Sequence, residues 1–74
     1  MAGTDAFKVE GVVVEVLSNL TYRVELANGH RPLGFVRGKA RIEMADLAVG
    51  QKVVLELSPF DLSRGRILVK KKQI

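Results

Sequence analysis

The sequence predicts an all-β domain, a five-stranded barrel with a short helix between the third and fourth strands. Apolar and polar residues alternate with a period of two through most of the chain, which is typical of half-buried strands. Clusters of Gly, Pro, Asn and Asp separate these stretches and indicate turns. The length of 74 residues allows one domain with a thin core. A closed barrel would remove the unpaired edges that an open sheet of this size exposes.

The first two strands are expected near the N-terminus. Residues 7–17, FKVEGVVVEVL, are rich in Val, which favours a strand. Gly11 within this stretch indicates a bend or bulge, where one strand can serve two sheets. Residues 21–26, TYRVEL, alternate cleanly, so the side chain of Tyr22 should point into the core.

A hairpin should follow the second strand. The dipeptide Asn28-Gly29 predicts a type I′ turn, after which His30 should be exposed. The return strand is expected over residues 31–37. Pro32 has no N–H to donate, so it belongs at an edge or a bulge of the sheet.

The second half of the chain supplies the helix and the last two strands. Residues 38–51 contain many good helix formers and break the alternation, so they predict one or two helical turns. Alternation resumes over residues 52–57, and residues 66–70 form the last strand. Between these strands, residues 58–67, SPFDLSRGRI, predict a compact turn in which Gly65 supplies a positive φ.

Five strands with a short helix between the third and fourth are typical of the OB-fold. An SH3-like small barrel is the structural alternative, although it would not place a helix at that point by preference. We expect one domain over residues 1–74, with residues 71–74 as a basic tail that need not be ordered.

The composition argues against several classes of protein. The chain has no cysteine, which excludes disulfides and thiolate zinc sites and fits a cytoplasmic protein. Residues 1–11 have no cationic start and no apolar core, so no signal peptide is expected. No apolar run approaches the roughly 20 residues that a membrane span requires.

The sequence gives little support for an enzyme. The chain has one histidine, His30, and it is expected at the surface next to a turn. No Cys or His cluster has the spacing of metal ligands, and no glycine-rich phosphate loop is present. We therefore expect no catalysis, no cofactor and no metal.

The charge distribution favours a nucleic-acid partner. The net charge is +4, but residues 1–30 carry −2, whereas residues 62–74 carry +5 with no acidic residue. A basic end of this kind attracts polyanions, and nucleic acid is the commonest. For Lys71 and Lys72 alone, a solvated tail is an equally good interpretation.

The aromatic residues suggest how RNA would be recognised. Single-strand binders combine a basic groove with several exposed stacking aromatics. This chain has four aromatic residues. Of these, Tyr22 is expected in the core, and Phe7 or Phe35 could also be buried. We therefore expect recognition of phosphates and RNA shape, with little reading of unpaired bases.

Four motifs resemble those of a known family. They are YRVELANGH at residues 22–30, GK at 38–39, GQKV at 50–53 and LSPFDLSRGRI at 57–67. In these motifs the chain resembles bacterial translation initiation factor one, nearly end to end and without gaps. The last motif is too long to be explained by turn chemistry alone.

The resemblance implies a function as well as a fold. It implies a monomeric OB barrel that binds the small ribosomal subunit at the decoding A site, beside 16S-type ribosomal RNA and a ribosomal protein, and assists the other initiation factors. It implies no catalysis and no cofactor. The matching positions, with Arg37 added from the same basic region, give these expected RNA-binding residues: Arg23, His30, Arg37, Gly38, Lys39, Arg41, Arg64, Arg66 and Lys70.

The compact turn is expected to present two of these residues. If the turn ends at Gly65, Arg64 and Arg66 project from it as a preset phosphate clamp. An alternative stays open, in which one of the two arginines pairs with Asp61 and only holds the loop together.

One segment departs from the family. Residues 38–48 read GKARIEMADLA, where members read close to GKMRKNYIRIL, so Ile42, Glu43, Met44 and Asp46 replace cationic or RNA-contacting types. Residues 30–36, HRPLGFV, also depart from the family pattern. The chain can be a divergent functional member, a paralogue with another RNA target, a general RNA-binding or RNA-chaperone OB protein, or an altered chain that keeps only the fold.

The departing segment generates the first prediction. Replacing Glu43→Lys and Asp46→Arg together should tighten binding to small ribosomal subunits and steepen its salt dependence, because each added phosphate contact releases counterions. Sedimentation with small subunits at several salt concentrations measures both quantities. Unchanged or weaker binding would mean that residues 38–48 do not face RNA in this protein.

Overall fold

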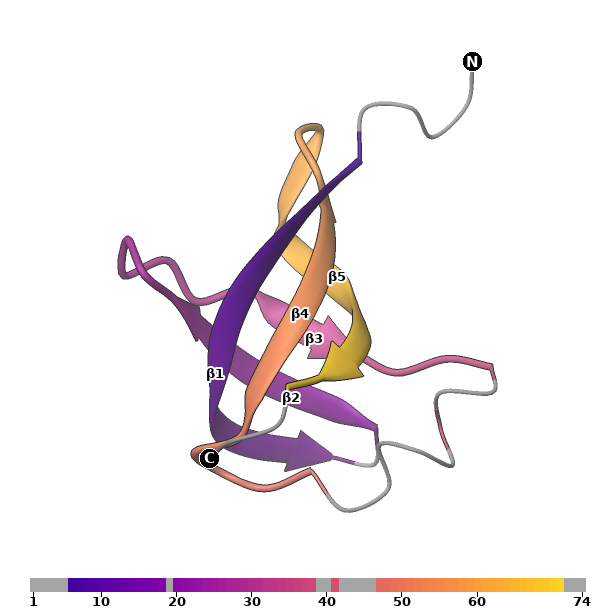
Figure 1. Ribbon diagram of the computed structural model, residues 1–74. Coiled ribbons are helices and arrows are strands. Elements are labelled where there is room, and N and C mark those ends of the chain that lie inside the picture. Colours follow the sequence, from indigo (N-terminus) through magenta and orange to yellow (C-terminus); the bar gives the residue numbers. More distant parts are fainter. Residues whose placement is uncertain (1–5, 19, 39–40, 42–46, 72–74) are drawn as a thin grey trace.

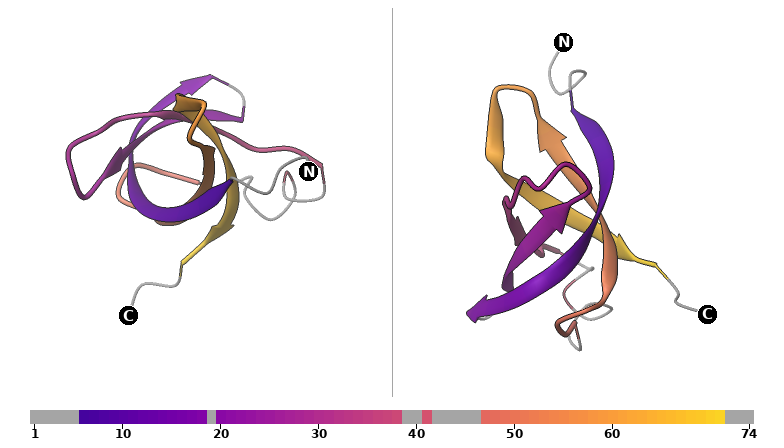
Figure 2. Two further views of the ribbon diagram at one scale, coloured as in Figure 1. Left: turned by 90° about the horizontal axis from the view of Figure 1, so that it is seen from above. Right: turned by 90° about the vertical axis from the view of Figure 1, so that its left-hand side faces the viewer.

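The computed structural model describes residues 6–18, 20–38, 41 and 47–71. In this part of the chain the strands are β1 (Phe7–Ser18), β2 (Thr21–Leu26), β3 (Leu33–Phe35), β4 (Lys52–Ser58) and β5 (Asp61–Lys70). They form a closed barrel in the order β1-β2-β3-β5-β4 (Figure 1), and the ring of strands is visible from above in Figure 2. This is the five-stranded barrel predicted for an OB-fold.

The predicted short helix stays a prediction. Most of it falls on residues 39–40 and 42–46, which lie outside the described residues. Within the described ranges, no helix is long and apolar enough to cross a membrane.

Strand β1 connects two neighbouring strands of the barrel. It pairs antiparallel with both β2 and β4, and Gly11 has a partner on each, Leu26 and Val53. The expectation that one strand serves two neighbours is therefore confirmed. Of the bend or bulge predicted at Gly11, the bulge is wrong, because the nearest register shift in the β1–β2 ladder falls at Val14.

The core follows from the alternation in the strands. Tyr22 is buried as predicted, and the alternate residues of β4 are buried too. The main core cluster consists of Val13, Tyr22, Val24, Val36, Leu47, Val53, Leu55 and Ile67. Every strand except β3 contributes to this cluster, and β3 is represented by the residue that follows it.

The β2–β3 turn differs from the prediction. A type I′ turn requires a positive φ at both central residues, but only Gly29 has one, at 87°. Three residues, 27–29, form the tip of the turn, and Leu26 closes it by donating to the carbonyl of His30 at 2.8 Å. The loop is also stabilised because the His30 N–H donates to Oδ1 of Asn28 at 2.9 Å.

Strand β3 is shorter than the predicted return strand of residues 31–37. Pro32 precedes it and cannot donate to the ladder, although its carbonyl accepts from the Val24 N–H at 3.1 Å. The strand therefore begins at Leu33 and ends at Phe35.

Strand β5 starts earlier than predicted. The turn of the β4–β5 hairpin is confined to Pro59 and Phe60, and the ladder already pairs Ser58 with Asp61. Gly65 lies inside the strand and is not among the residues with positive φ, so its predicted role in the turn is wrong.

Gly65 is required by a close contact between strands. A Cβ atom at this position would lie 2.5 Å from Cδ2 of Leu57 and 2.6 Å from the carbonyl oxygen of Glu56. Real Cβ atoms do not approach this closely, and a backbone atom cannot move aside as a flexible side chain can. The glycine therefore allows β4 and β5 to pack at the point where the barrel closes.

The contact at Gly65 generates the second prediction. Gly65→Ala should lower the free energy of unfolding by about 2 kcal/mol or more, because the added methyl group overpacks the barrel wall. Urea unfolding measures the effect. Gly29→Asn is the control, since Gly29 has open space around it and Asn tolerates a positive φ. Equal stability of the two variants would show that β4 and β5 can move apart at no cost.

Candidate nucleic-acid interface

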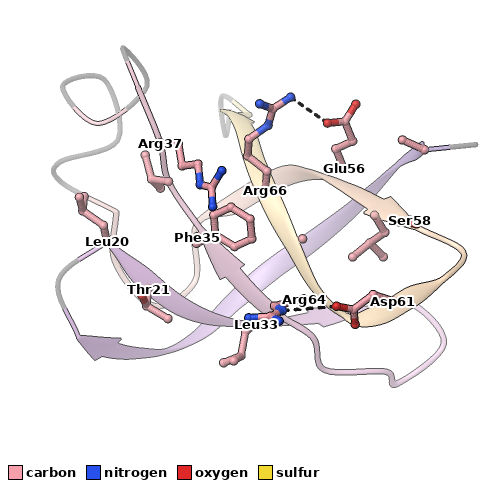
Figure 3. Close-up of a pocket in the computed structure, with 14 residues that line it drawn as sticks. Leu20, Thr21, Leu33, Phe35, Arg37, Glu56, Ser58, Asp61, Arg64 and Arg66 are labelled. Atoms are coloured by element: carbon pink, nitrogen blue, oxygen red, sulfur yellow. Dashed lines mark hydrogen bonds and ion pairs between the residues drawn. The ribbon is translucent and has the colours of Figure 1, made fainter. Parts of the chain in front are cut away.

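A groove of about 890 Å³ runs along the outer surface where β3 and β5 lie side by side. The close-up in Figure 3 shows it with its lining side chains. We name it the β3–β5 groove, and the side chains that give it its chemical character are Leu33, Phe35, Arg37, Glu56, Asp61, Arg64 and Arg66.

The register of the sheet explains why these side chains meet. Strands β3 and β5 are parallel, with Leu33 opposite Arg64 and Phe35 opposite Arg66. Paired residues project to the same face of a sheet, and alternate residues of a strand share that face. The two arginines therefore both lie on the outer face of β5, while Gly65 between them is buried. The prediction that a turn presents Arg64 and Arg66 is wrong, because both lie within β5. Their action as a phosphate clamp stays a prediction.

Each of the two arginines is paired with a carboxylate. Nη2 of Arg66 donates to Oε1 of Glu56 at 2.8 Å, and Nε of Arg64 donates to Oδ2 of Asp61 at 3.3 Å. Both arginine side chains remain about half or more exposed, at 49% for Arg66 and 67% for Arg64. Such exposed pairs contribute little to stability, so the guanidinium groups can exchange partners.

Asp61 also organises the β4–β5 hairpin. Its Oδ1 accepts from the backbone N–H of Ser63 at 3.1 Å and from the Ser63 hydroxyl at 2.5 Å. These bonds to Ser63, followed by the interaction with Arg64, lower the pKa of the Asp61 carboxyl below its ordinary value. The pairing with Asp61 that the alternative required is present for Arg64, while Arg66 has a different partner. Whether Arg64 only holds the loop stays open.

An aromatic side chain completes the groove. The guanidinium carbon of Arg37 lies 5.0 Å from the centre of the Phe35 ring, a cation–π distance. Figure 3 shows Arg37 beside Phe35, with the two ion pairs at separate positions along the groove. The sequence left open whether Phe35 is buried. It is half-buried and lines the groove, and Phe60 at the hairpin tip is 84% exposed.

Two predicted residues border the groove without lining it. Arg23 is in register with Leu33, and its Nη1 donates to the carbonyl of Arg31 at 2.9 Å. His30 is exposed as predicted, and its Nε2 lies 2.5 Å from the carbonyl oxygen of Leu62. The imidazole therefore links the β2–β3 loop to β5, a role that the sequence did not indicate.

Of the remaining predicted residues, those that the structure describes do not line the groove. Gly38 adopts a positive φ of 61°, and its carbonyl accepts from the N–H of Arg41 at 3.1 Å. Lys70 pairs with the core residue Val53 at the far end of β5. Lys39 lies outside the described residues. Of the nine predicted RNA-binding residues, the structure thus brings Arg37, Arg64 and Arg66 into one groove.

Sequence reasoning missed one acidic residue of the groove, Glu56. Glu56 was one of several outward residues on an alternating strand, and its proximity to Arg66 depends on the β4–β5 register. In the described part of the chain, no three His, Cys, Asp or Glu side chains are grouped so that they could hold a metal ion.

Solved structures that match this chain include two related barrels. The solution structure of translation initiation factor one from the Wolbachia endosymbiont strain TRS of Brugia malayi has a TM-score of 0.75 and 31% identity, covering 97% of this chain and 84% of that one. The crystal structure of YjeQ from Thermotoga maritima has a TM-score of 0.70 and 29% identity, covering 90% of this chain but 23% of that protein. A scan against models of known protein families gives no match. The first similarity confirms the family resemblance inferred from the motifs.

The lowered pKa of Asp61 generates the third prediction. A carboxyl group whose pKa is lower in the folded state stabilises the fold above its unfolded pKa, and this contribution disappears as the pH falls through the folded pKa. The melting temperature of the wild type should therefore exceed that of Asp61→Ala at neutral pH, and the difference should shrink below about pH 4. Thermal unfolding from pH 7 to pH 2 tests this. A difference that is constant with pH would assign the effect to the side chain's shape and not to its charge.

Proposed function

We propose that this chain, which belongs to the family of bacterial translation initiation factor one, binds the small ribosomal subunit at the decoding A site through contacts to ribosomal RNA. The observation that carries the proposal is the β3–β5 groove, where Arg37, Arg64 and Arg66 meet on one outer face of the barrel. Planar guanidinium groups suit phosphate oxygens because they can donate two parallel hydrogen bonds.

The proposed interface extends from the groove to neighbouring residues. Arg23 and His30 border the groove, and the further proposed contacts, Gly38, Lys39 and Arg41, follow β3 in the sequence. Lys70 is the weakest of the nine candidates, because it pairs with Val53 at the far end of β5. We propose that the protein acts in the cytoplasm as a monomer, next to a ribosomal protein and the other initiation factors.

The proposed role requires no catalysis. A factor of this kind acts by occupying a site, so its effect depends on affinity and shape alone. The groove offers arginines for binding, and both of its carboxylates are engaged by arginines at 2.8 and 3.3 Å.

A general RNA-binding or RNA-chaperone activity is the second candidate. It is favoured by the presence of Phe35 in a groove that three arginines also line, since an aromatic face in a basic groove suits single strands. Sedimentation with small ribosomal subunits, in the presence of excess unstructured RNA, separates the two. One-to-one binding that resists the competitor supports the initiation factor, and binding that the competitor removes supports the general RNA binder.

The arginine pair generates the fourth prediction. Arg64→Ala combined with Arg66→Ala should weaken binding to small subunits strongly and lower its salt slope by roughly two units, because two phosphate contacts are lost. The same change should alter the free energy of unfolding by less than about 1 kcal/mol, since both ion pairs are exposed.

The control removes the same charge from outside the groove, with Arg31→Ala and Lys52→Ala. Binding should weaken less in this variant than in the groove variant. If the groove variant has a much lower melting temperature but binds small subunits as the wild type does, the arginines stabilise the fold and the proposed contact is wrong.

A further inference from the structure

The β3–β5 groove has the composition of a single-strand site, but its binding groups are already engaged within the chain. Glu56 holds Arg66 at 2.8 Å, and Asp61 holds Arg64 at 3.3 Å. Arg37 lies over the Phe35 ring at 5.0 Å. A single-stranded RNA would bind its phosphates to the guanidinium groups and stack its bases on the aromatic face.

We propose that the carboxylate of Glu56 excludes single-stranded RNA from the groove and so makes the protein selective for folded RNA. The inference deepens the proposed function, on which it rests for the nature of the partner. Glu56 and Asp61 are negative charges within a basic surface, and like charges brought together at an interface suppress the wrong partner.

The size of the groove makes the repulsion selective. At about 890 Å³ it has the volume of a small-molecule pocket, which a short stretch of single strand can enter. Phosphates inside it would lie next to the carboxylates. An RNA duplex is stiff and carries its phosphates on the outside, so it would contact the exposed edges of the arginines at the rim. Because electrostatic repulsion decreases with distance and is screened by salt, the duplex is repelled less.

Glu56 is the suitable residue for a test, because its described interaction is the ion pair with Arg66 on the neighbouring strand. Asp61 is unsuitable, since it also bonds Ser63 and organises the hairpin. The variant Glu56→Gln removes the charge and preserves the size of the side chain. Its matched control is Glu25→Gln, which removes an exposed carboxylate outside the β3–β5 groove. Oε2 of Glu25 pairs with Nε of Arg31 at a distance of 3.3 Å.

The experiment compares three RNA probes at one salt concentration. Fluorescence anisotropy measures the dissociation constants for an unstructured oligouridine and for a short RNA duplex, and sedimentation measures binding to small ribosomal subunits. Thermal unfolding of each variant verifies that it is folded. The control variant accounts for the general effect of one additional positive net charge.

The expected result is tighter binding of oligouridine by Glu56→Gln, about fivefold beyond the control, as one unit charge at about 4 Å would produce in water. Duplex affinity should change by less than about twofold relative to the control, so the preference for duplex falls. Equal effects of Glu56→Gln and Glu25→Gln on oligouridine would overturn the proposal, and so would an equal gain for the duplex. Weaker oligouridine binding would also overturn it, because Glu56 would then orient Arg66 for the strand.

The subunit measurement keeps the two proposals separate. If the wild type does not bind small subunits, the proposed initiation function fails, and the ratio of oligouridine to duplex binding still decides the role of Glu56. If subunits bind as proposed but the ratio does not change, the selectivity proposal fails alone.

Discussion

The barrel depends on close contacts between strands at two inward-facing glycines, Gly34 on β3 and Gly65 on β5. Gly34 and Gly65 are directly in register in the parallel β3–β5 ladder. A Cβ on Gly34 would lie 3.0 Å from two atoms of Ile67, and a Cβ on Gly65 would meet β4 at 2.5 Å. A side chain at Gly65 would clash with the backbone of β4, and one at Gly34 would require the side chain of Ile67 to shift. Without these glycines β5 could not pair as closely with β3 and β4, and a domain of this size would expose unpaired strand edges.

The same glycine pair determines what the outer surface presents. Because successive residues of a strand point to opposite faces, an inward Gly65 places Arg64 and Arg66 outward. An inward Gly34 does the same for Leu33 and Phe35. The groove is therefore a direct consequence of barrel closure, and its arginines stand on a rigid strand and not on a loop. A binding group that is already ordered loses little entropy when it engages a partner.

Local patterns predicted most of the architecture, and the errors fall where contacts are distant in sequence. The alternation in β2 and β4 was sufficient to identify their buried faces, including Tyr22. Gly65 was assigned to a turn because its neighbours are turn residues. In the structure a glycine is needed there because of the close contact with Leu57 across the β4–β5 ladder. The pairing of Glu56 with Arg66 depends on the β4–β5 register, which is irregular between Leu57 and Ser58 and has no local signal.

The charges of the groove bear on how such a protein could bind RNA at all. A basic surface attracts every polyanion, and this non-specific attraction weakens steeply as salt increases. Here Glu56 and Asp61 neutralise part of that attraction at the groove itself, and in the segment that departs from the family, Glu43 and Asp46 add acid in sequence beyond β3. Both features lower the general attraction for phosphates. An RNA partner would then have to compensate by complementary shape, with phosphates placed to meet the exposed edges of the arginines, and recognition would depend on the fold of the RNA more than on its charge.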